Sequence, residues 1–187
     1  VLAIDPKGDI GNLALAFPRL APDEFAPYYA TYVSLVPDGD VTATLASQLE
    51  ETLDLLRPLS EEQALFRYAP GKWSVKEVVT HLTDAERVFM YRALSFGRGA
   101  TDSLPSFDEN AWAPMAEADQ VPLDELLDEF DAVRSSTVSL LAHLPREAWG
   151  RRGIASGKGV SVRALAWIVA GHERHHARVL RERYLKG

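Results

Sequence analysis

The chain contains no cysteine, and this absence excludes several kinds of chemistry. Without a thiol, a protein of 187 residues has no disulfide framework, no thiolate ligand for zinc and no cysteine nucleophile. Any metal ion must therefore be held by histidine, carboxylate or water. Thiol chemistry, if the protein performs it, requires a thiol from outside the chain.

Long apolar runs and an excess of positive charge are also lacking. No stretch is long enough to span a bilayer, and LALAF near the N-terminus is too short for the apolar core of a secretory signal. The formal net charge is −7, so there is no general basic field to hold a phosphate backbone. We therefore expect a cytoplasmic protein that binds neither membrane nor nucleic acid.

Prolines are concentrated at the start of the chain, where Pro6, Pro18, Pro22, Pro27 and Pro37 precede the first long periodic segment. This distribution predicts an N-terminal arm, residues 1–39, with short helical pieces. Residues 40–187 would then form the main domain, with the arm packed on it. The composition, 47% hydrophobic and 25% charged, is typical of an ordinary globular domain.

Four segments of the main domain have the apolar periodicity of long helices. They are predicted between Asp40 and Pro58, from Ser74 to Gly97, after Pro122, and from Ser161 to about Tyr184. Ser74 and Glu77 form a capping box, and Ser161 is a suitable N-cap. The stripe predicted for the third helix is Leu123, Leu126, Phe130, Val133, Thr137 and Leu140.

The connections complete the predicted fold. A crossover of about 25 residues, long for a simple connection, separates the second and third helices. The segment GIASGKG is interpreted as a flexible connection, because its Gly-Lys pair departs from the phosphate-binding loop pattern. No segment has a convincing strand pattern. The sequence predicts an all-α four-helix bundle in which the long crossover changes the simple up-and-down order.

Three of the five histidines lie in the stretch GHERHHARVL of the last helix. His172 and His176 are one turn apart in the middle of its apolar stripe, so both should point into the bundle, whereas Glu173 should point toward solvent or a neighbouring edge. Burial of two imidazoles in an apolar interior costs free energy unless their ring nitrogens have polar partners. A shared divalent cation is such a partner for both rings. The alternative to a metal site is that these histidines belong to a core that binds no metal.

His172, Glu173 and His176 also spell H-E-x-x-H, the spacing of many zinc proteases. The extended downstream motif of those enzymes is missing, because no histidine follows His176. The third ligand should come from upstream, and His81 in the second long helix is the best-placed candidate. His143 is explained by the carbonyl groups at the end of the third helix. The protease is therefore the least favoured alternative.

Several neighbours of this site are of interest. Asp84 and Glu86 are candidate partners for the imidazole of His81, although an exposed or inter-helix position explains both. Trp73 and Trp112 are candidates for the mouth of a pocket, although aromatic residues at such positions are more often core.

The segments KWS…H and GHERHH, together with PYYATYVSLVPDGD and SFDENAW, resemble the DinB-like (YfiT-like) metal-binding four-helix bundles. The resemblance covers most of the chain. It implies one divalent metal ion on His81, His172 and His176, with nickel or zinc first and iron or manganese as further candidates. Some members of the family resemble S-transferases that use bacillithiol or a related low-molecular-weight thiol. We also expect a homodimer.

Three imidazoles leave a coordination position open for a water molecule or a thiol, which a cation would activate as a nucleophile. The leading hypothesis is a metal-dependent hydrolase or transferase, including a thiol S-transferase, that acts on a small molecule. The alternative from another class is a non-catalytic, dimeric metal-binding or stress-response protein. Neither the metal nor the substrate follows from the sequence, because imidazole suits several divalent ions.

Overall fold

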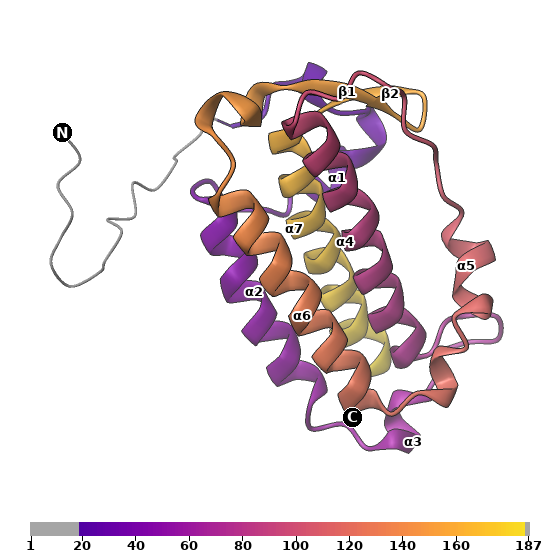
Figure 1. The fold of residues 1–187 in the computed structure, drawn as a ribbon. Coiled ribbons are helices and arrows are strands. Elements are labelled where there is room, and N and C mark those ends of the chain that lie inside the picture. The colour runs from indigo at the N-terminus through magenta and orange to yellow at the C-terminus, as the bar shows by residue number, and fades with distance from the viewer. Residues whose placement is uncertain (1–18, 186–187) are drawn as a thin grey trace, which may run out of the picture.

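The computed structural model describes residues 19–185, in which four long helices pack as a four-helix bundle (Figure 1). They are α2 (Val41–Leu56), α4 (Val75–Gly97), α6 (Leu123–Ala142) and α7 (Val162–Val179), the last continuing as a π-helical turn over Leu180–Tyr184. The predicted fold class is confirmed, and each predicted helix is present at its expected place. Among the described residues, no helix is both long and apolar enough to cross a membrane.

Side-chain caps fix where three of these helices begin. The Asp40 carboxylate accepts hydrogen bonds from the first turn of α2, and the Ser161 hydroxyl does the same for α7. Ser74 and Glu77 form the predicted capping box of α4. These bonds satisfy backbone N–H groups that have no partner within the helix.

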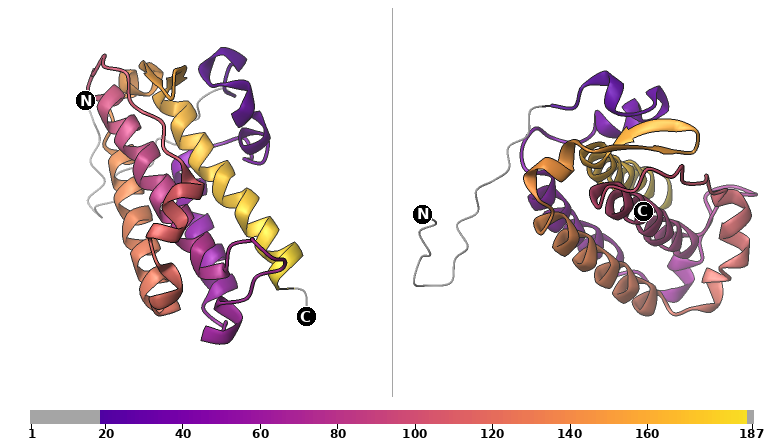
Figure 2. Two further views of the ribbon diagram at one scale, coloured as in Figure 1. Left: turned by 90° about the vertical axis from the view of Figure 1, so that its right-hand side faces the viewer. Right: turned by 45° about the horizontal axis from the view of Figure 1, so that its top comes forward.

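The order of the helices in space differs from a simple up-and-down bundle. Helices α2 and α4 each pack against both α6 and α7 (Figures 1 and 2). Helices α4 and α6 run parallel because the crossover returns the chain along the length of the bundle. Leu104 lies at one end, paired with Ala155, and Asp119 lies at the other, where it accepts a hydrogen bond from Ser74. The crossover contains α5 (Glu109–Met115) and a 3-10 turn, Ala118–Gln120.

The expectation of no strands was wrong at the connection before α7. Strands β1 (Arg152–Ala155) and β2 (Lys158–Ser161) form an antiparallel hairpin across the end of the bundle (Figure 1). Its two turn residues, Ser156 and Gly157, have positive φ angles of 52° and 71°, as a tight hairpin turn requires. Leu104 of the crossover adds two backbone hydrogen bonds to the hairpin. The four-residue strands are too short to show periodicity, so the sequence pattern did not reveal them.

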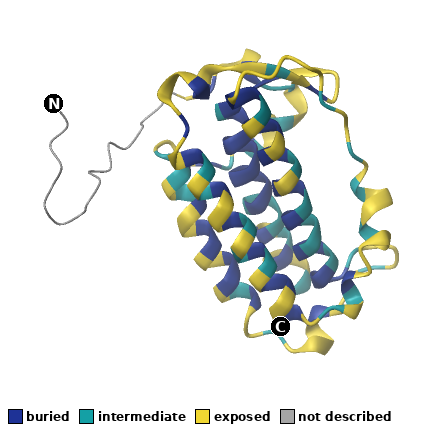
Figure 3. Ribbon diagram, in the orientation of Figure 1, coloured by how far each residue is buried: buried dark blue, intermediate teal, exposed yellow. Residues whose placement is uncertain are grey.

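The core consists of two hydrophobic clusters, one toward each end of the bundle, and the inward faces of the helices are buried (Figure 3). On each long helix the clusters meet at one level, for example between Leu82 and Ala85 on α4. Buried polar side chains occupy that level: Gln48, Glu86, Arg134 and Glu173. We refer to these four residues as the polar layer.

Helix α6 buries most of the stripe expected for it, namely Leu123, Leu126, Phe130 and Thr137, but departs from it at two positions. Arg134 and Leu141 are buried, whereas Val133 and Leu140 are only partly so. An arginine is 1% exposed here because carboxylates on two neighbouring helices bind it. A rule that places only apolar residues in the core cannot identify such a position.

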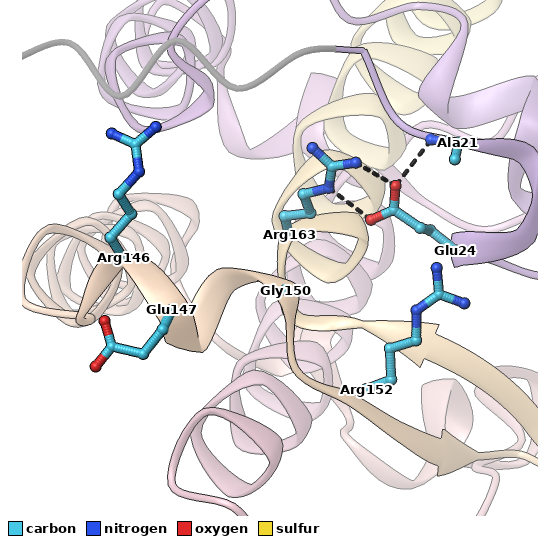
Figure 4. Close-up of a pocket in the computed structure, with 7 residues that line it drawn as sticks. All are labelled: Ala21, Glu24, Arg146, Glu147, Gly150, Arg152 and Arg163. Carbon is cyan, nitrogen blue, oxygen red and sulfur yellow. Dashed lines mark hydrogen bonds and ion pairs between the residues drawn. The ribbon is translucent and has the colours of Figure 1, made fainter.

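The described part of the N-terminal arm contains two 3-10 turns, Pro22–Glu24 and Pro27–Tyr29, and the short helix α1 (Ala30–Val33). Val33 joins the core. At the start of α7, Arg163 donates a hydrogen bond to Glu24 (Figure 4), and so does the hydroxyl of Ser161. The division of the chain at residues 39 and 40 stays a prediction. Pro6 and Pro18, on which the arm was partly based, lie outside the described residues.

Candidate metal centre

His81, His172 and His176 converge on one point, and their ring nitrogens lie within 4.8 Å of one another. The Nε2 atom of His172 is 3.0 Å from that of His81 and 3.1 Å from that of His176. The site combines α4 and α7, which pack side by side although the residues are 91 positions apart. The structure therefore brings together the three histidines that the sequence selected.

The donor set fits a divalent cation. A ring nitrogen carries either one proton or one lone pair, so His172 Nε2 cannot make good hydrogen bonds to both neighbours. Burial lowers the pKa of His81 to about 4 and that of His176 to about 3, and it holds the pKa of His172 well below its usual range. All three rings are thus neutral near pH 7, the form in which imidazole binds metal.

Aromatic side chains surround the histidines. The Tyr32 ring meets that of His172 edge to face, with centroids 5.3 Å apart, and the Trp73 ring lies 4.8 Å from that of His81. Trp73 thus lies at the pocket. Trp112 packs against Phe107 and is 45% exposed.

The acidic candidates near His81 have other partners. Asp84 pairs with Arg87 at 3.6 Å, and Glu86 binds Arg134 between the helices. His143 lies at the end of α6 as expected, where its Nδ1 atom is 2.7 Å from the carbonyl oxygen of Ser139.

The expectation that Glu173 points outward was wrong. Its carboxylate is buried and accepts hydrogen bonds from Arg134 Nη1 (2.7 Å), Gln48 Nε2 (2.8 Å) and Thr52 Oγ1 (2.6 Å). Helix α2 packs on this side of α7 and supplies two of these donors. A carboxylate engaged in this way has no freedom to act as the base of an H-E-x-x-H protease.

The histidines line a cavity of about 240 Å³. Its walls also include Tyr28, Tyr29, Tyr32, Trp73, Ala85, Phe89, Arg92, Phe107, Glu109, Asn110, Ser156 and His175. A larger cavity, about 670 Å³, lies among the charged residues around Glu24 and Arg163 and contains no histidine (Figure 4). The smaller cavity has the convergent polar groups and aromatic walls that are typical of a ligand site.

Arg92 and Glu109 are the charged residues of this cavity that the sequence interpretation missed. His81, Ala85, Phe89 and Arg92 follow one another at helix spacing, so one face of α4 lines the cavity. This periodicity could have identified Arg92. Glu109 is the first residue of α5, and only the path of the crossover brings it to the site.

The comparisons with known proteins agree with this geometry. The family model of the DinB superfamily matches residues 44–180, which include all three histidines. The chain belongs to the DinB superfamily. "Putative metal-dependent hydrolase OB0413" of Oceanobacillus iheyensis is 25% identical over 135 residues, covering 71% of this chain and 75% of the relative. A protein of Geobacillus kaustophilus with the same description, GK0616, is 30% identical and covers 69% and 74%.

Two solved structures share the fold of this DinB-superfamily chain. YfiT from Bacillus subtilis, described as a probable metal-dependent hydrolase with an unusual four-helix bundle topology, has a TM-score of 0.62 at 18% identity. The superposition covers 91% of this chain and 97% of YfiT. A DinB-like protein of the same organism, YjoA, has a TM-score of 0.55 at 22% identity, covering 76% and 87%.

Proposed function

We propose that this DinB-superfamily protein binds one divalent metal ion through His81, His172 and His176 and uses it for hydrolysis of, or group transfer to, a small molecule. The observation that supports this most is the convergence of three buried, neutral imidazoles in the wall of a cavity. Names of the curated relatives, which refer to metal-dependent hydrolases, point in the same direction. Nickel and zinc are the first candidates, followed by iron and manganese.

A divalent cation held by three histidines acts as a Lewis acid and lowers the pKa of a water molecule or thiol at its open position. Water as the nucleophile gives a hydrolase. A low-molecular-weight thiol of the bacillithiol type gives an S-transferase, which suits a chain that has no cysteine. Both reactions use the same site and differ in what enters the cavity.

Glu109 is our candidate for the group that receives the proton of the nucleophile. It lines the cavity together with His81 and is only partly buried. Within residues 19–185, its carboxylate makes no ion pair or hydrogen bond to another side chain, so it is available to a ligand. A carboxylate beside the nucleophile is a suitable general base.

Tyr32 supplies a hydroxyl in the wall of the same cavity. Burial raises the pKa of this phenol above its usual value, and so does the hydrogen-bonding contact with Tyr28, whose hydroxyl is 3.4 Å away. The hydroxyl stays protonated near pH 7 and can donate a hydrogen bond to a bound ligand.

The alternative function is a non-catalytic, cytoplasmic metal-binding protein that acts as a homodimer. Tyr91 is 59% exposed and Leu94 is 38% exposed, and the two are neighbours on the outer face of α4. A second copy of the chain could cover this pair. A dimer is also compatible with catalysis, so only the absence of turnover would favour the alternative.

Elemental analysis of protein purified without a nickel column tests the proposal. We expect about one metal ion per chain in the wild type and none in His81→Ala or His172→Ala. The matched control is His143→Ala, which removes a histidine outside the site and should keep the metal. Metal in none of the four proteins after incubation with zinc or nickel would refute the site. A screen of ester, amide and thiol-transfer substrates on the loaded protein then separates the catalytic function from the alternative.

A further inference from the structure

The cavity of the metal centre contains a second cationic group, the guanidinium of Arg92. This residue is 2% exposed, yet the cavity reaches it. Its Nη2 atom donates to the carbonyl oxygen of Pro105 at 2.6 Å and to the hydroxyl of Ser156 at 3.1 Å. The Phe89 and Phe107 rings lie beside the guanidinium, with their centroids 5.7 and 5.9 Å from its Cζ atom.

None of these neighbours carries a negative charge. Over the part of the chain that the structure describes, no carboxylate forms an ion pair with Arg92. The neighbouring hydroxyl of Tyr29 does not supply one, because burial raises the pKa of that phenol. Aromatic faces and oxygen dipoles offset part of the cost of burying a cation, but a buried charge is usually paired. Arg134, by contrast, is held by two carboxylates.

The position of Arg92 relative to the histidines matches a ligand that extends along α4. Arg92 lies 11 residues, or about three helical turns, beyond His81 on α4, so the two side chains line different parts of the cavity. The Phe89 ring lies between the two polar ends, 6.4 Å from the ring of His172 and in contact with the guanidinium. The acid of the cavity, Glu109, lines the wall beside His81 and forms no ion pair with Arg92 among the described residues.

From these contacts we infer that the substrate carries a carboxylate, which Arg92 binds, joined by a short apolar segment over Phe89 to the group that reacts at the histidines. A carboxylate provides the missing counter-charge and accepts the charge-assisted hydrogen bonds that a guanidinium donates. Ser156 and Pro105 orient the guanidinium from the hairpin and the crossover. The identification of this ligand as the substrate rests on the proposed function. The inference that Arg92 binds a carboxylate is independent of it.

The test uses metal-free protein in the presence of a chelator, with hexanoate and hexan-1-ol as probes of equal chain length. Binding is measured from the shift of the melting temperature and by titration calorimetry. Because a hydrogen-bonded charge pair is worth a factor of about 10 or more in affinity, wild type should prefer hexanoate by at least about 10-fold. Arg92→Gln should bind both probes within about 2-fold of each other. Arg98→Gln, which replaces the exposed arginine directly after the last residue of the same helix, is the control and should keep the preference.

Equal binding of hexanoate and hexan-1-ol by the wild type would overturn the inference, and this comparison needs no variant. Retention of the full preference in Arg92→Gln would overturn it as well. If Arg92→Gln does not fold, Arg92→Lys keeps the charge and should prefer hexanoate by less than the wild type. Metal content reports separately on the proposed function. Metal bound without carboxylate preference refutes the inference alone, and carboxylate preference without metal refutes the metal centre alone.

Discussion

Glu173 accepts a 2.7 Å hydrogen bond from Arg134 in the centre of the bundle, while the residue before it, His172, faces the cavity on the other side of α7. The same arginine binds both carboxylate oxygens of Glu86, at 2.9 and 2.8 Å. Helices α4 and α7, which carry the three histidines, are therefore fixed to each other by one guanidinium from α6. The polar layer and the candidate metal centre lie at the same level of the bundle.

Removal of Arg134 should destabilise the fold strongly. Arg134→Met leaves Glu86 and Glu173 buried without their cation, and breaking a buried ion pair from one side costs about 3–5 kcal/mol. The free energy of unfolding, measured by urea denaturation, should fall by that amount. Arg57→Met, which replaces an exposed arginine, is the control and should change it by less than about 0.5 kcal/mol.

A triple variant tests whether unpaired charge, and not lost packing, causes the loss of stability in Arg134→Met. Arg134→Met combined with Glu86→Leu and Glu173→Leu removes the cation and both anions, so it should recover much of the stability that the single variant loses. If the triple variant were less stable than the single one, the charges would not be the cause.

Acid should destabilise the contact between the arm and α7. Burial alone would raise the pKa of Glu24, but the hydrogen bonds from Arg163, the Ala21 amide and Ser161 outweigh it and lower the pKa to about 2. In the unfolded chain this carboxyl titrates near 4.5. Its contribution to stability is therefore complete above pH 4.5 and is lost as the pH falls toward 2.

By linkage this contribution is at most about 3 kcal/mol. Glu24→Gln should be less stable than the wild type at pH 6 and should lose less stability between pH 4.5 and 2. The free energy of unfolding across that range is the measurement. Asp23→Asn, an exposed neighbour, should follow the wild type; a parallel loss in wild type and Glu24→Gln would contradict the assignment.

Metal should stabilise the folded protein. A ligand that binds only the native state adds about 2.7 kcal/mol at a concentration 100 times its Kd. Zinc or nickel should therefore raise the melting temperature of the wild type and of His143→Ala but not of His81→Ala. Differential scanning calorimetry with and without chelator measures the effect, and an equal rise in His81→Ala would place the metal elsewhere.

Gly171 allows the arm to approach α7 closely. A Cβ atom at this position would lie 2.1 Å from the carbonyl oxygen of Tyr32, so the backbone of the arm would have to move. We expect Gly171→Ala to cost about 1–3 kcal/mol and to make residues 19–39 more sensitive to protease. The control is Gly159→Ala, where nothing lies within 4 Å of the added atom. Equal protease sensitivity in both variants would contradict this role of Gly171.

The sequence predicted those parts of the molecule that local rules determine. The helices follow from periodicity and caps such as Ser74, and the inward positions of His172 and His176 follow from helix geometry. The burial of Arg134 and Glu173 was not predicted, because it depends on charges supplied by other helices. Arg92 was missed for a similar reason, since its role depends on the cavity beside it.

The cavity residues that the sequence did not reveal come from the crossover and the hairpin. Glu109 and Ser156 reach the cavity only because the chain returns along the bundle and closes over its end. Neither position has a periodic pattern that a single sequence reveals. The resemblance to a known family named the same three histidines as the helix faces, but it assigned no role to the residues that surround them.

The separation of His81 from His172 along the chain also has a consequence for how the protein is made. The two residues are 91 positions apart, so the histidines of α4 and α7 cannot meet until the chain between them has been synthesised and has left the ribosome. Short-range contacts form first in folding, and contacts this distant in sequence form late. The three-histidine site therefore cannot form before α7 has been made and has packed against α4.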